Sequence, residues 1–442
     1  MSLALMGGCN LTQTGEATPA RTLNFPIALE TAGVTDTGAS AFLLVANSNF
    51  DLRYNTGTLM TLDLERLRTM IGDNCGETEC RFADEDGSLP SELVISEVAI
   101  GSHVDGMALA PNGGSFVATG DQGTEATRVY LPVRSERSLT WLSLGLDGRL
   151  DCAQEEVDGE PIPRCGDARR GIGDDPTESE RALVLNGDPI SVATGRLEDI
   201  GGEPGEGNFI LTALRDGRVA MFLDGAGQTP TLVHIAEGFP ENLITLTMQP
   251  GEGIGWLTSS GTDAIGRVGV VLDPVRTRSF LFDAGSRRLG GVDDGEDIRD
   301  MVFHPTLPQA FVLSRRPEAV VSVDLEGRGL TANDLGLLDL WEVGQGPSRM
   351  VLTQVGGRNY VLVSCFDAQR LFVIDVDAGS LVSVVGGFSG PFEFAVDEVS
   401  EQLFLTDFST SVIRVVDLAP LAQNQTPTVL ATLGEPFSPS GL

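Results

Sequence analysis

Residues 347–385 read PSRMVLTQVGGRNYVLVSCFDAQRLFVIDVDAGSLVSVV, and the same plan returns in residues 391–433 as PFEFAVDEVSEQLFLTDFSTSVIRVVDLAPLAQNQTPTVLATL. Each copy holds four short runs rich in Val, Leu, Ile and Phe, separated by Gly, Asp, Ser and Asn. This pattern is typical of a four-stranded antiparallel meander. One such sheet cannot bury both of its faces alone, so a series of them must pack together.

The repeat extends through most of the chain. The third run of each unit tends to end in an apolar residue followed by aspartate, and these aspartates are Asp63, Asp224, Asp273, Asp324, Asp375 and Asp417. The last five are 49, 51, 51 and 42 residues apart, and the longer interval from Asp63 accommodates one further unit with Ser143 in the aspartate position. Seven such units predict an all-β protein, a seven-bladed β-propeller with four antiparallel strands per blade, with six or eight blades as alternatives.

The same pattern predicts the domain organisation. We expect one propeller domain over residues 22–435, preceded by a tether over 1–21 and followed by a tail over 436–442. Two insertions are expected, at about 69–90 in the first blade and at 147–181 in the second. The first and last blades each supply four strands of their own, so the ring is predicted to close by packing between blades, without a shared sheet.

The charge of the chain excludes two classes of partner. The chain has 63 acidic residues against 29 basic ones, all arginine, and a formal net charge of −34. A strong negative field repels nucleic acid and anionic lipid, so neither is expected to bind directly. We attribute the charge to a generally acidic proteome, with a cation-binding role as the alternative.

The first ten residues, MSLALMGGCN, resemble the end of a bacterial lipoprotein signal peptide. The charged start and most of the apolar region of such a peptide are missing. The resemblance implies that Cys9 is lipidated and that the protein is exported, to the outer membrane, periplasm or cell surface, with membrane contact through the lipid anchor only. The alternatives are a secreted protein and an incidental cysteine in a polar tail.

The remaining cysteines support export. Cys75 and Cys80 fall in one insertion, and Cys152 and Cys165 fall in the other, so we predict two local disulfides formed in an oxidising compartment. A metal site is the alternative, but neither pair has the CxxC spacing or a nearby histidine. Cys365 lies in a predicted strand and is expected to be a buried apolar residue.

The repeat unit resembles the YVTN-type repeats of bacterial and archaeal β-propellers, and also the lactonase-type propellers. The match is clearest over residues 297–435, and the nearest forms of the tetrapeptide are LVAN at residues 44–47 and LTD at residues 405–407. The resemblance implies the fold, but implies little about function because one propeller fold serves many functions.

Propellers bind ligands in or around their central channel, which the innermost strands line. Aligning these strands places Asp300, Arg349 and Glu393 at one position on three adjacent blades, with Gly106 and Thr245 at that position on two others. These three charged residues are therefore candidates for catalysis: they could bind a cation, orient a polar substrate or supply an acid and a base. The alternative is that Arg349 neutralises two carboxylates and closes the channel.

Two acidic segments are weak candidates for Ca²⁺ ligands, because they carry carboxylates at spacings that Ca²⁺ can use. Their residues are Asp293, Asp294, Glu296 and Asp297 in one segment, and Asp84 and Asp86 in the other. Neither segment matches the EF-hand pattern, so solvated acidic turns are the alternative. No other cofactor is indicated.

Histidine placement argues against a catalytic triad or a histidine metal site. The chain has three histidines, and His103 and His304 are expected at opposite ends of the channel. The GxSxG, HExxH and phosphate-loop motifs are absent from the sequence.

These observations favour a non-catalytic, envelope-anchored or secreted propeller that binds a partner protein or a surface component. The first alternative is a lactonase-like hydrolase that uses the channel cluster, with a divalent ion as an optional partner. The second alternative is a subunit of an extracellular assembly, which predicts an exposed apolar patch or an unpaired outer strand on a blade.

Overall fold

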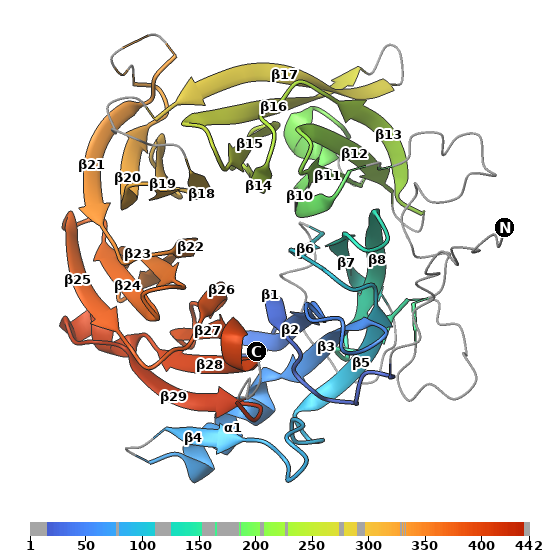
Figure 1. Ribbon diagram of the computed structural model, residues 1–442, viewed down its shortest axis with the longest axis vertical. Helices are drawn as coiled ribbons and strands as arrows, with labels where there is room; N and C mark the ends of the chain where they lie inside the picture. The colour runs from blue at the N-terminus through green and yellow to red at the C-terminus, as the bar shows by residue number, and fades with distance from the viewer. Residues whose placement is uncertain are drawn as a thin grey trace, which may run out of the picture.

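The computed structural model describes residues 16–76, 79–110, 125–152, 164–165, 185, 187–203, 207–225, 229–273, 278–289, 297–327, 329, 331 and 333–436. Seven antiparallel sheets stand around a central axis, each with its first strand innermost (Figure 1). The chain is therefore a seven-bladed β-propeller with four antiparallel strands per blade, as the sequence predicts.

The strands of the first four blades follow one another in chain order, from the axis outward. Blade 1 consists of β1 (Pro26–Val34), β2 (Ser40–Asn47), β3 (Gly57–Asp63) and β5 (Val94–Ile100). Blade 2 consists of β6 (Ala108–Leu109), β7 (Glu125–Val133), β8 (Ser138–Gly145) and β9 (Leu150–Asp151). Blade 3 consists of β10 (Pro189–Arg196), β11 (Asn208–Leu214), β12 (Arg218–Asp224) and β13 (Thr231–Ala236). Blade 4 consists of β14 (Leu243–Met248), β15 (Ile254–Ser259), β16 (Ala264–Asp273) and β17 (Arg278–Arg288).

The last three blades repeat this order. Blade 5 consists of β18 (Ile298–Phe303), β19 (Gln309–Arg315), β20 (Glu318–Asp324) and β21 (Gly336–Glu342). Blade 6 consists of β22 (Pro347–Val355), β23 (Arg358–Cys365), β24 (Arg370–Asp375) and β25 (Ser380–Val385). Blade 7 consists of β26 (Pro391–Asp397), β27 (Gln402–Asp407), β28 (Val412–Asp417) and β29 (Thr428–Leu433).

The core lies between the blades. Phe311 and Leu313 of β19 share one buried apolar cluster with Val361 and Val363 of β23 on the neighbouring blade. A blade with neighbours on both sides must be apolar on both faces. This requirement explains why the second and third strands read as continuous apolar runs rather than as alternating ones.

The predicted aspartates mark the ends of third strands. β3, β12, β16, β20, β24 and β28 each end on the aspartate that the sequence pattern identifies. Where the turn follows directly, the carboxylate caps it: Asp375 Oδ1 accepts from the Ala378 amide at 2.8 Å, and Asp417 Oδ1 from the Ala419 amide at 3.0 Å. In blade 2 the third strand continues past Ser143 to Gly145.

A second polar position ends the second strand of blades 1 and 7. Asn47 Oδ1 accepts a hydrogen bond from the Asn24 amide at 3.1 Å, and Asp407 Oδ1 accepts one from the Gly390 amide at 2.7 Å. In both blades the donor belongs to the loop that leads into the innermost strand. The polar end of the LVAN and LTD segments therefore positions the entry to the channel.

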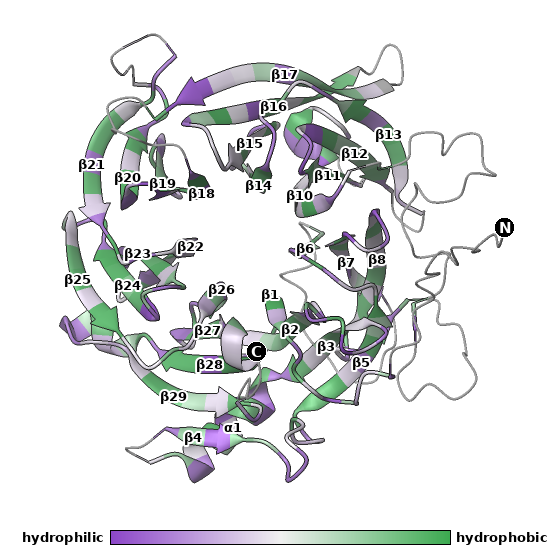
Figure 2. Cartoon of the chain, viewed as in Figure 1, coloured by the Kyte–Doolittle hydropathy of each residue, from purple (hydrophilic) through white to green (hydrophobic). Residues whose placement is uncertain are grey.

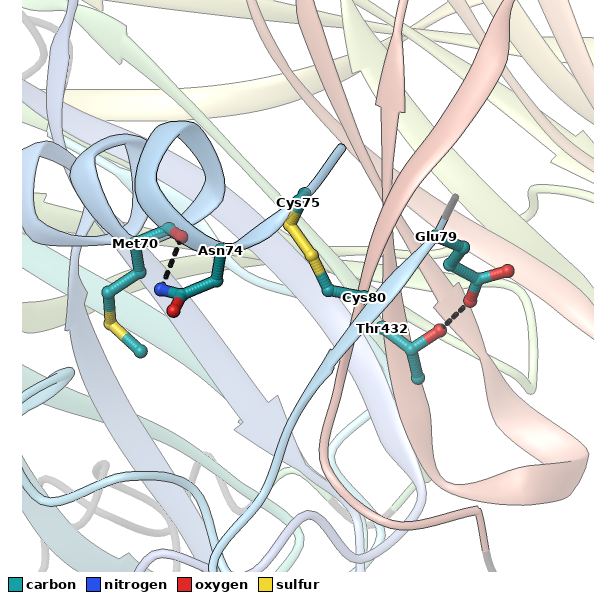
Figure 3. The surroundings of a disulfide bond; sticks show 6 residues. All are labelled: Met70, Asn74, Cys75, Glu79, Cys80 and Thr432. Carbon is teal, nitrogen blue, oxygen red and sulfur yellow. Dashed lines mark hydrogen bonds between the residues drawn. A yellow bond between two sulfur atoms is a disulfide. The ribbon is translucent and has the colours of Figure 1, made fainter. Parts of the chain in front are cut away.

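The prediction that the ring closes without a shared sheet is wrong. The insertion of blade 1 forms α1 (Leu64–Asn74) and then β4 (Cys80–Phe82), and β4 pairs in parallel with β29 as a fifth strand of blade 7. The Cys75–Cys80 disulfide, with Cα atoms 5.4 Å apart, links the end of α1 to β4 (Figure 3). The Arg414 guanidinium of β28 also contacts the Glu79 carboxylate at 2.7 Å. The first blade is thereby fastened to the last.

The second predicted disulfide is absent. β9 falls inside the predicted insertion of blade 2 and places Cys152, a free thiol, in the core between blades 1 and 2. Cys165 lies in the same core, where its amide donates to the Ala99 carbonyl of β5 at 3.1 Å. The two cysteines thus lie in one core but are not bonded to each other. Cys365 is buried in β23, as expected, and burial raises the pKa of its thiol to about 12.

Lipidation and export stay predictions. Cys9 lies outside the described residues. Among the residues that the structure describes, no helix has the length and apolar character that crossing a membrane requires.

Candidate functional site in the axial channel

Five of the seven innermost strands enter the channel through the same irregularity. In β1, β10, β14, β18 and β22 the pairing with the second strand shifts after the first residue and resumes at the third. The third residue of six innermost strands and Gly106, which precedes β6, line one cavity of about 210 Å³ on the axis. These seven residues, here called the channel ring, are Ala28, Gly106, Ser191, Thr245, Asp300, Arg349 and Glu393. The structure therefore places Asp300, Arg349 and Glu393 together, with Gly106 and Thr245 at the equivalent positions.

The charged side chains of the channel ring form hydrogen bonds with one another and with backbone amides. Arg349 Nε donates to Glu393 Oε2 at 3.2 Å, across blades 6 and 7. Asp300 accepts from the Met301 amide and, across blades 5 and 6, from the Met350 amide, each at 2.9 Å. The cluster therefore holds three adjacent blades together.

Sequence reasoning missed Glu30, which lines the same cavity from β1. Burial and the neighbouring Glu393 carboxylate raise the pKa of Glu30 to about 8, so this side chain is largely uncharged at neutral pH. Burial also raises the pKa of Asp300 to about 6, although Arg349 opposes the shift, and it raises the pKa of Glu393. Glu30 lies two residues beyond the ring position, where the alignment of charged residues did not reach.

A second cavity, of about 400 Å³, opens at the end of the channel where the second strands finish. We call it the channel mouth. Its lining includes four arginines, Arg215, Arg299, Arg315 and Arg349, and two aspartates, Asp105 and Asp367. Arg215 follows β11, Arg315 ends β19 and Arg299 lies in β18. These arginines do not share a repeat position or a short sequence motif, so the sequence analysis did not identify them.

The charges at the channel mouth are close enough to influence one another. Burial lowers the pKa of Arg299, with Arg315 and Arg349 adding to the effect, although Asp297 contacts the Arg299 guanidinium at 2.8 Å. Burial raises the pKa of Asp105 against the opposing charges of Arg134, Arg215 and Arg349. The mouth therefore gathers four arginines in an acidic protein, with Arg299 and Arg349 paired to the carboxylates of Asp297 and Glu393.

Aromatic side chains line one side of the mouth and continue onto the surface. Phe366 and Phe392 belong to the lining, and Phe408 lies 6.4 and 6.0 Å from them between ring centroids. Phe50 lies 5.6 Å from Phe408 and is 54% exposed. The Arg349 guanidinium lies 5.0 Å from the Phe392 ring centroid, so a cation–π contact joins the aromatic and cationic sides.

In the two acidic segments that were predicted to bind Ca²⁺, the described carboxylates already have protein partners. Asp84 pairs with Arg21 at 2.8 Å, and Asp86 Oδ1 accepts from the amide and hydroxyl of Ser88, which lowers the pKa of Asp86. Asp297 pairs with Arg299. Asp293, Asp294 and Glu296 lie outside the described residues. Within the described ranges, no group of three or more His, Cys, Asp or Glu side chains is placed to hold a metal ion.

The histidines lie apart. His103 follows β5, and its ring stacks on Phe50 beside the channel mouth, with centroids 5.8 Å apart. His304 follows β18 at the other end of that strand, where Nδ1 accepts from the Thr306 and Leu307 amides at 3.2 and 3.1 Å. His234 belongs to the outer strand β13. A site shared by His103 and His304 is therefore ruled out by geometry.

Comparison with known proteins establishes the fold alone. The sequence matches no protein-family profile and no curated protein. Among solved structures it is similar to hydrazine synthase of Kuenenia stuttgartiensis, with 12% identity, a TM-score of 0.52 and coverage of 91% of this chain and 98% of that one.

Two further solved structures have a TM-score of 0.50. A functionally unknown protein of Desulfotomaculum acetoxidans DSM 771 is 13% identical over 84% of this chain and 95% of that one. A proposed 6-phosphogluconolactonase of Bacteroides uniformis ATCC 8492 is 15% identical over 83% of this chain and 85% of that one. At such identities a shared propeller carries no shared activity.

Proposed function

We propose that the protein is a non-catalytic binding scaffold that docks a partner protein along the outer edges of blades 5 and 6. The observation that carries this proposal is an exposed apolar periphery. Of the 12 large apolar side chains exposed in the described structure, eight lie on the outermost strands of three adjacent blades, namely Phe280 and Phe282 of β17, Leu337, Leu338 and Leu340 of β21, and Leu381, Val382 and Val384 of β25. Figure 2 shows apolar segments on β21 and β25 at the rim.

Comparison between blades indicates that this edge lacks the cover that blade 7 has. The outermost strand carries a bulge at an equivalent position in several blades, where Leu338, Val382 and Leu430 occupy it in blades 5, 6 and 7. Leu430 packs against the apolar cluster that contains Phe82 of β4. Leu338 and Val382 are 56% and 44% exposed. Blade 7 is thus covered by a strand at the position where blades 5 and 6 expose apolar side chains.

The covered blade indicates what kind of occupant fits. β4 adds three residues to the edge of β29 and buries Phe82. In the described structure β21 and β25 end their sheets without a fifth strand. An unpaired edge with apolar side chains is a template for strand addition. We infer that an extended, apolar segment of a partner protein adds to β21 or β25 as β4 adds to β29.

Export is part of the same proposal. The Cys75–Cys80 disulfide supports an oxidising compartment. We retain lipidation at Cys9, anchorage at the cell envelope or secretion, and kinship with YVTN-type propellers as proposals. A subunit role in an extracellular assembly would use the same apolar edge.

Photo-crosslinking in cells that naturally produce the protein tests the docking edge. A photoreactive amino acid at Leu338 or Val382 should yield one discrete adduct with another protein, whereas the same amino acid at Val399, equally apolar and 59% exposed, should not. A Leu338→Ser/Val382→Ser protein carrying the probe at Leu340 should lose the adduct. A homodimeric adduct would assign the edge to a second copy of this chain. Equal labelling at positions 338 and 399 would overturn the proposal.

A lactonase-like hydrolase remains the second candidate, because Glu30 and Asp300 have raised pKa values in one cavity. The hydrogen bonds that already occupy Asp300 and Glu393 weigh against it. Hydrolysis of a panel of sugar and acyl lactones, with and without Ca²⁺, tests it. If the wild type hydrolyses a lactone and Glu30→Gln or Asp300→Asn abolishes the activity, the hydrolase becomes the favoured function. If the wild type hydrolyses none, this candidate is rejected.

A further inference from the structure

We propose that the channel mouth binds a small organic anion, of the aryl phosphate or aryl carboxylate class, with its anionic group among the arginines and its aromatic part against Phe366 and Phe392. This site is separate from the docking edge and does not depend on it. A cavity of about 400 Å³ is of the size that holds small ligands.

The charge of the lining argues for an anion. Four arginines and two aspartates line the mouth, in a protein whose formal net charge is −34. Arg299 and Arg349 also pair with Asp297 and Glu393 outside the lining, so Arg215 and Arg315 are the positive charges least neutralised by the protein. Burial lowers the pKa of Arg299, and charge repulsion from the neighbouring Arg315 and Arg349 adds to the shift. An anion between them would relieve that repulsion, and guanidinium groups suit phosphate and carboxylate oxygens because they can donate two parallel hydrogen bonds.

Several donors at the mouth are unused. Nε of Arg299 is buried and has no hydrogen-bond partner. The Arg215 guanidinium has no hydrogen-bond or ion-pair partner among the residues described. The Arg315 guanidinium, within the described ranges, pairs only with the half-exposed Asp367, at 3.1 Å. These groups converge on one cavity from blades 3 and 5, so the site is assembled by the closed ring and by no single blade.

The phenylalanines on one side of the mouth indicate that the ligand also has an apolar or aromatic part. Phe366 and Phe392 line the cavity, and Phe408 and Phe50 extend the surface outward. An apolar ring placed there would bury against aromatic faces while its charged group stayed among the guanidinium groups. The mouth therefore fits an anion attached to a planar or apolar body better than a fully hydrated inorganic ion.

Isothermal titration calorimetry of the whole protein with phenyl phosphate, benzoate, inorganic phosphate and phenol tests the site. We expect one saturable site for phenyl phosphate or benzoate, inorganic phosphate at least tenfold weaker, and no binding of phenol. The stronger of the two aryl anions distinguishes a phosphate from a carboxylate site. Affinity should fall as salt rises.

Variants locate the site. Arg215→Gln and Arg315→Gln should each weaken the aryl anion at least tenfold, while Arg149→Gln, whose side chain is 78% exposed outside the mouth, should leave affinity unchanged. Phe366→Leu should weaken the aryl anion and spare inorganic phosphate. Circular dichroism melting confirms that each variant folds. Absence of saturable binding up to millimolar concentration, or equal losses in Arg149→Gln and Arg215→Gln, would overturn the proposal.

Discussion

Arg349 and Glu393, from the innermost strands of adjacent blades, form an ion pair at 3.2 Å inside the channel. The side chain of Arg349 is 13% exposed and that of Glu393 is 23% exposed, so solvent screens this pair little. Asp300, also in the channel ring, uses its two oxygens on backbone amides. The guanidinium is thus the counter-charge for a carboxylate cluster that holds blades 5, 6 and 7 together.

Replacing Arg349 by alanine should therefore destabilise the fold. We expect a loss of about 3 kcal/mol in the free energy of unfolding near pH 8, because a buried carboxylate loses its partner. The pKa values of Asp300 and Glu393 should rise further, so the loss should shrink towards pH 5. Urea unfolding at both pH values measures this, with Arg149→Ala as the exposed control. An equal loss at both pH values would contradict the electrostatic explanation.

Glu30 makes stability depend on pH. Its pKa is about 8 in the folded protein against an ordinary value of 4.5, so between these values the folded state keeps a proton that the unfolded state has released. Stability contributed by this site is therefore lost as pH rises from about 4.5 to about 8. Glu30→Gln should be at least about 2 kcal/mol more stable than the wild type at pH 9 and no different at pH 4. A Glu241→Gln control, at an exposed position, should track the wild type. If the stability of Glu30→Gln followed that of the wild type at every pH, the raised pKa of Glu30 would be wrong.

Asp407 should be a sensitive position outside the channel. It is fully buried and accepts from the Ser389 and Gly390 amides and from Arg414 Nε. Asp407→Ala should cost about 3 kcal/mol of unfolding free energy, because two amides and a guanidinium lose their acceptor. Asp407→Asn should cost less, since Asn47 does the same work in blade 1. Chemical denaturation of the two variants measures these costs, and equal costs would mean that a neutral acceptor cannot replace the carboxylate at this position.

The disulfide should stabilise the closure locally. A Cys75→Ser/Cys80→Ser protein should lose about 2 kcal/mol or less, because the bond closes a short loop. Amide hydrogen exchange at Arg81 and Phe82 should rise, while exchange in β27 and β28 should stay as in the wild type. If exchange rose throughout blade 7, pairing with β4 would be necessary for the stability of the whole blade, which would contradict a local effect.

The blade register could be predicted because turns need particular residues at fixed places. Asp375 and Asp417 end their strands where a carboxylate caps the following turn, and the repeat of that requirement revealed the period. The same alignment brought Asp300, Arg349 and Glu393 to one ring, since equivalent positions in a propeller face one axis.

The remaining features depend on contacts that no local pattern records. β4 has three residues and pairs with a strand from the far end of the chain. Neither an alternation of apolar residues nor the repeat spacing could therefore predict it. Arg215 and Arg315 come from turns of different blades and meet only when the ring closes. Cys152 and Cys165 were predicted to pair in an exposed insertion, but β9 and the contact of Cys165 with β5 place both in the core between blades 1 and 2.

The docking edge is the central claim, and the affinity of the partner captured at Leu338 tests it most directly. Biolayer interferometry should compare the wild type, Leu338→Ser/Val382→Ser and Val399→Ser, with Arg215→Gln as a channel-mouth control. The account predicts at least tenfold weaker binding for the first variant alone. Wild-type affinity in that variant, or an equal loss in Val399→Ser, would contradict it.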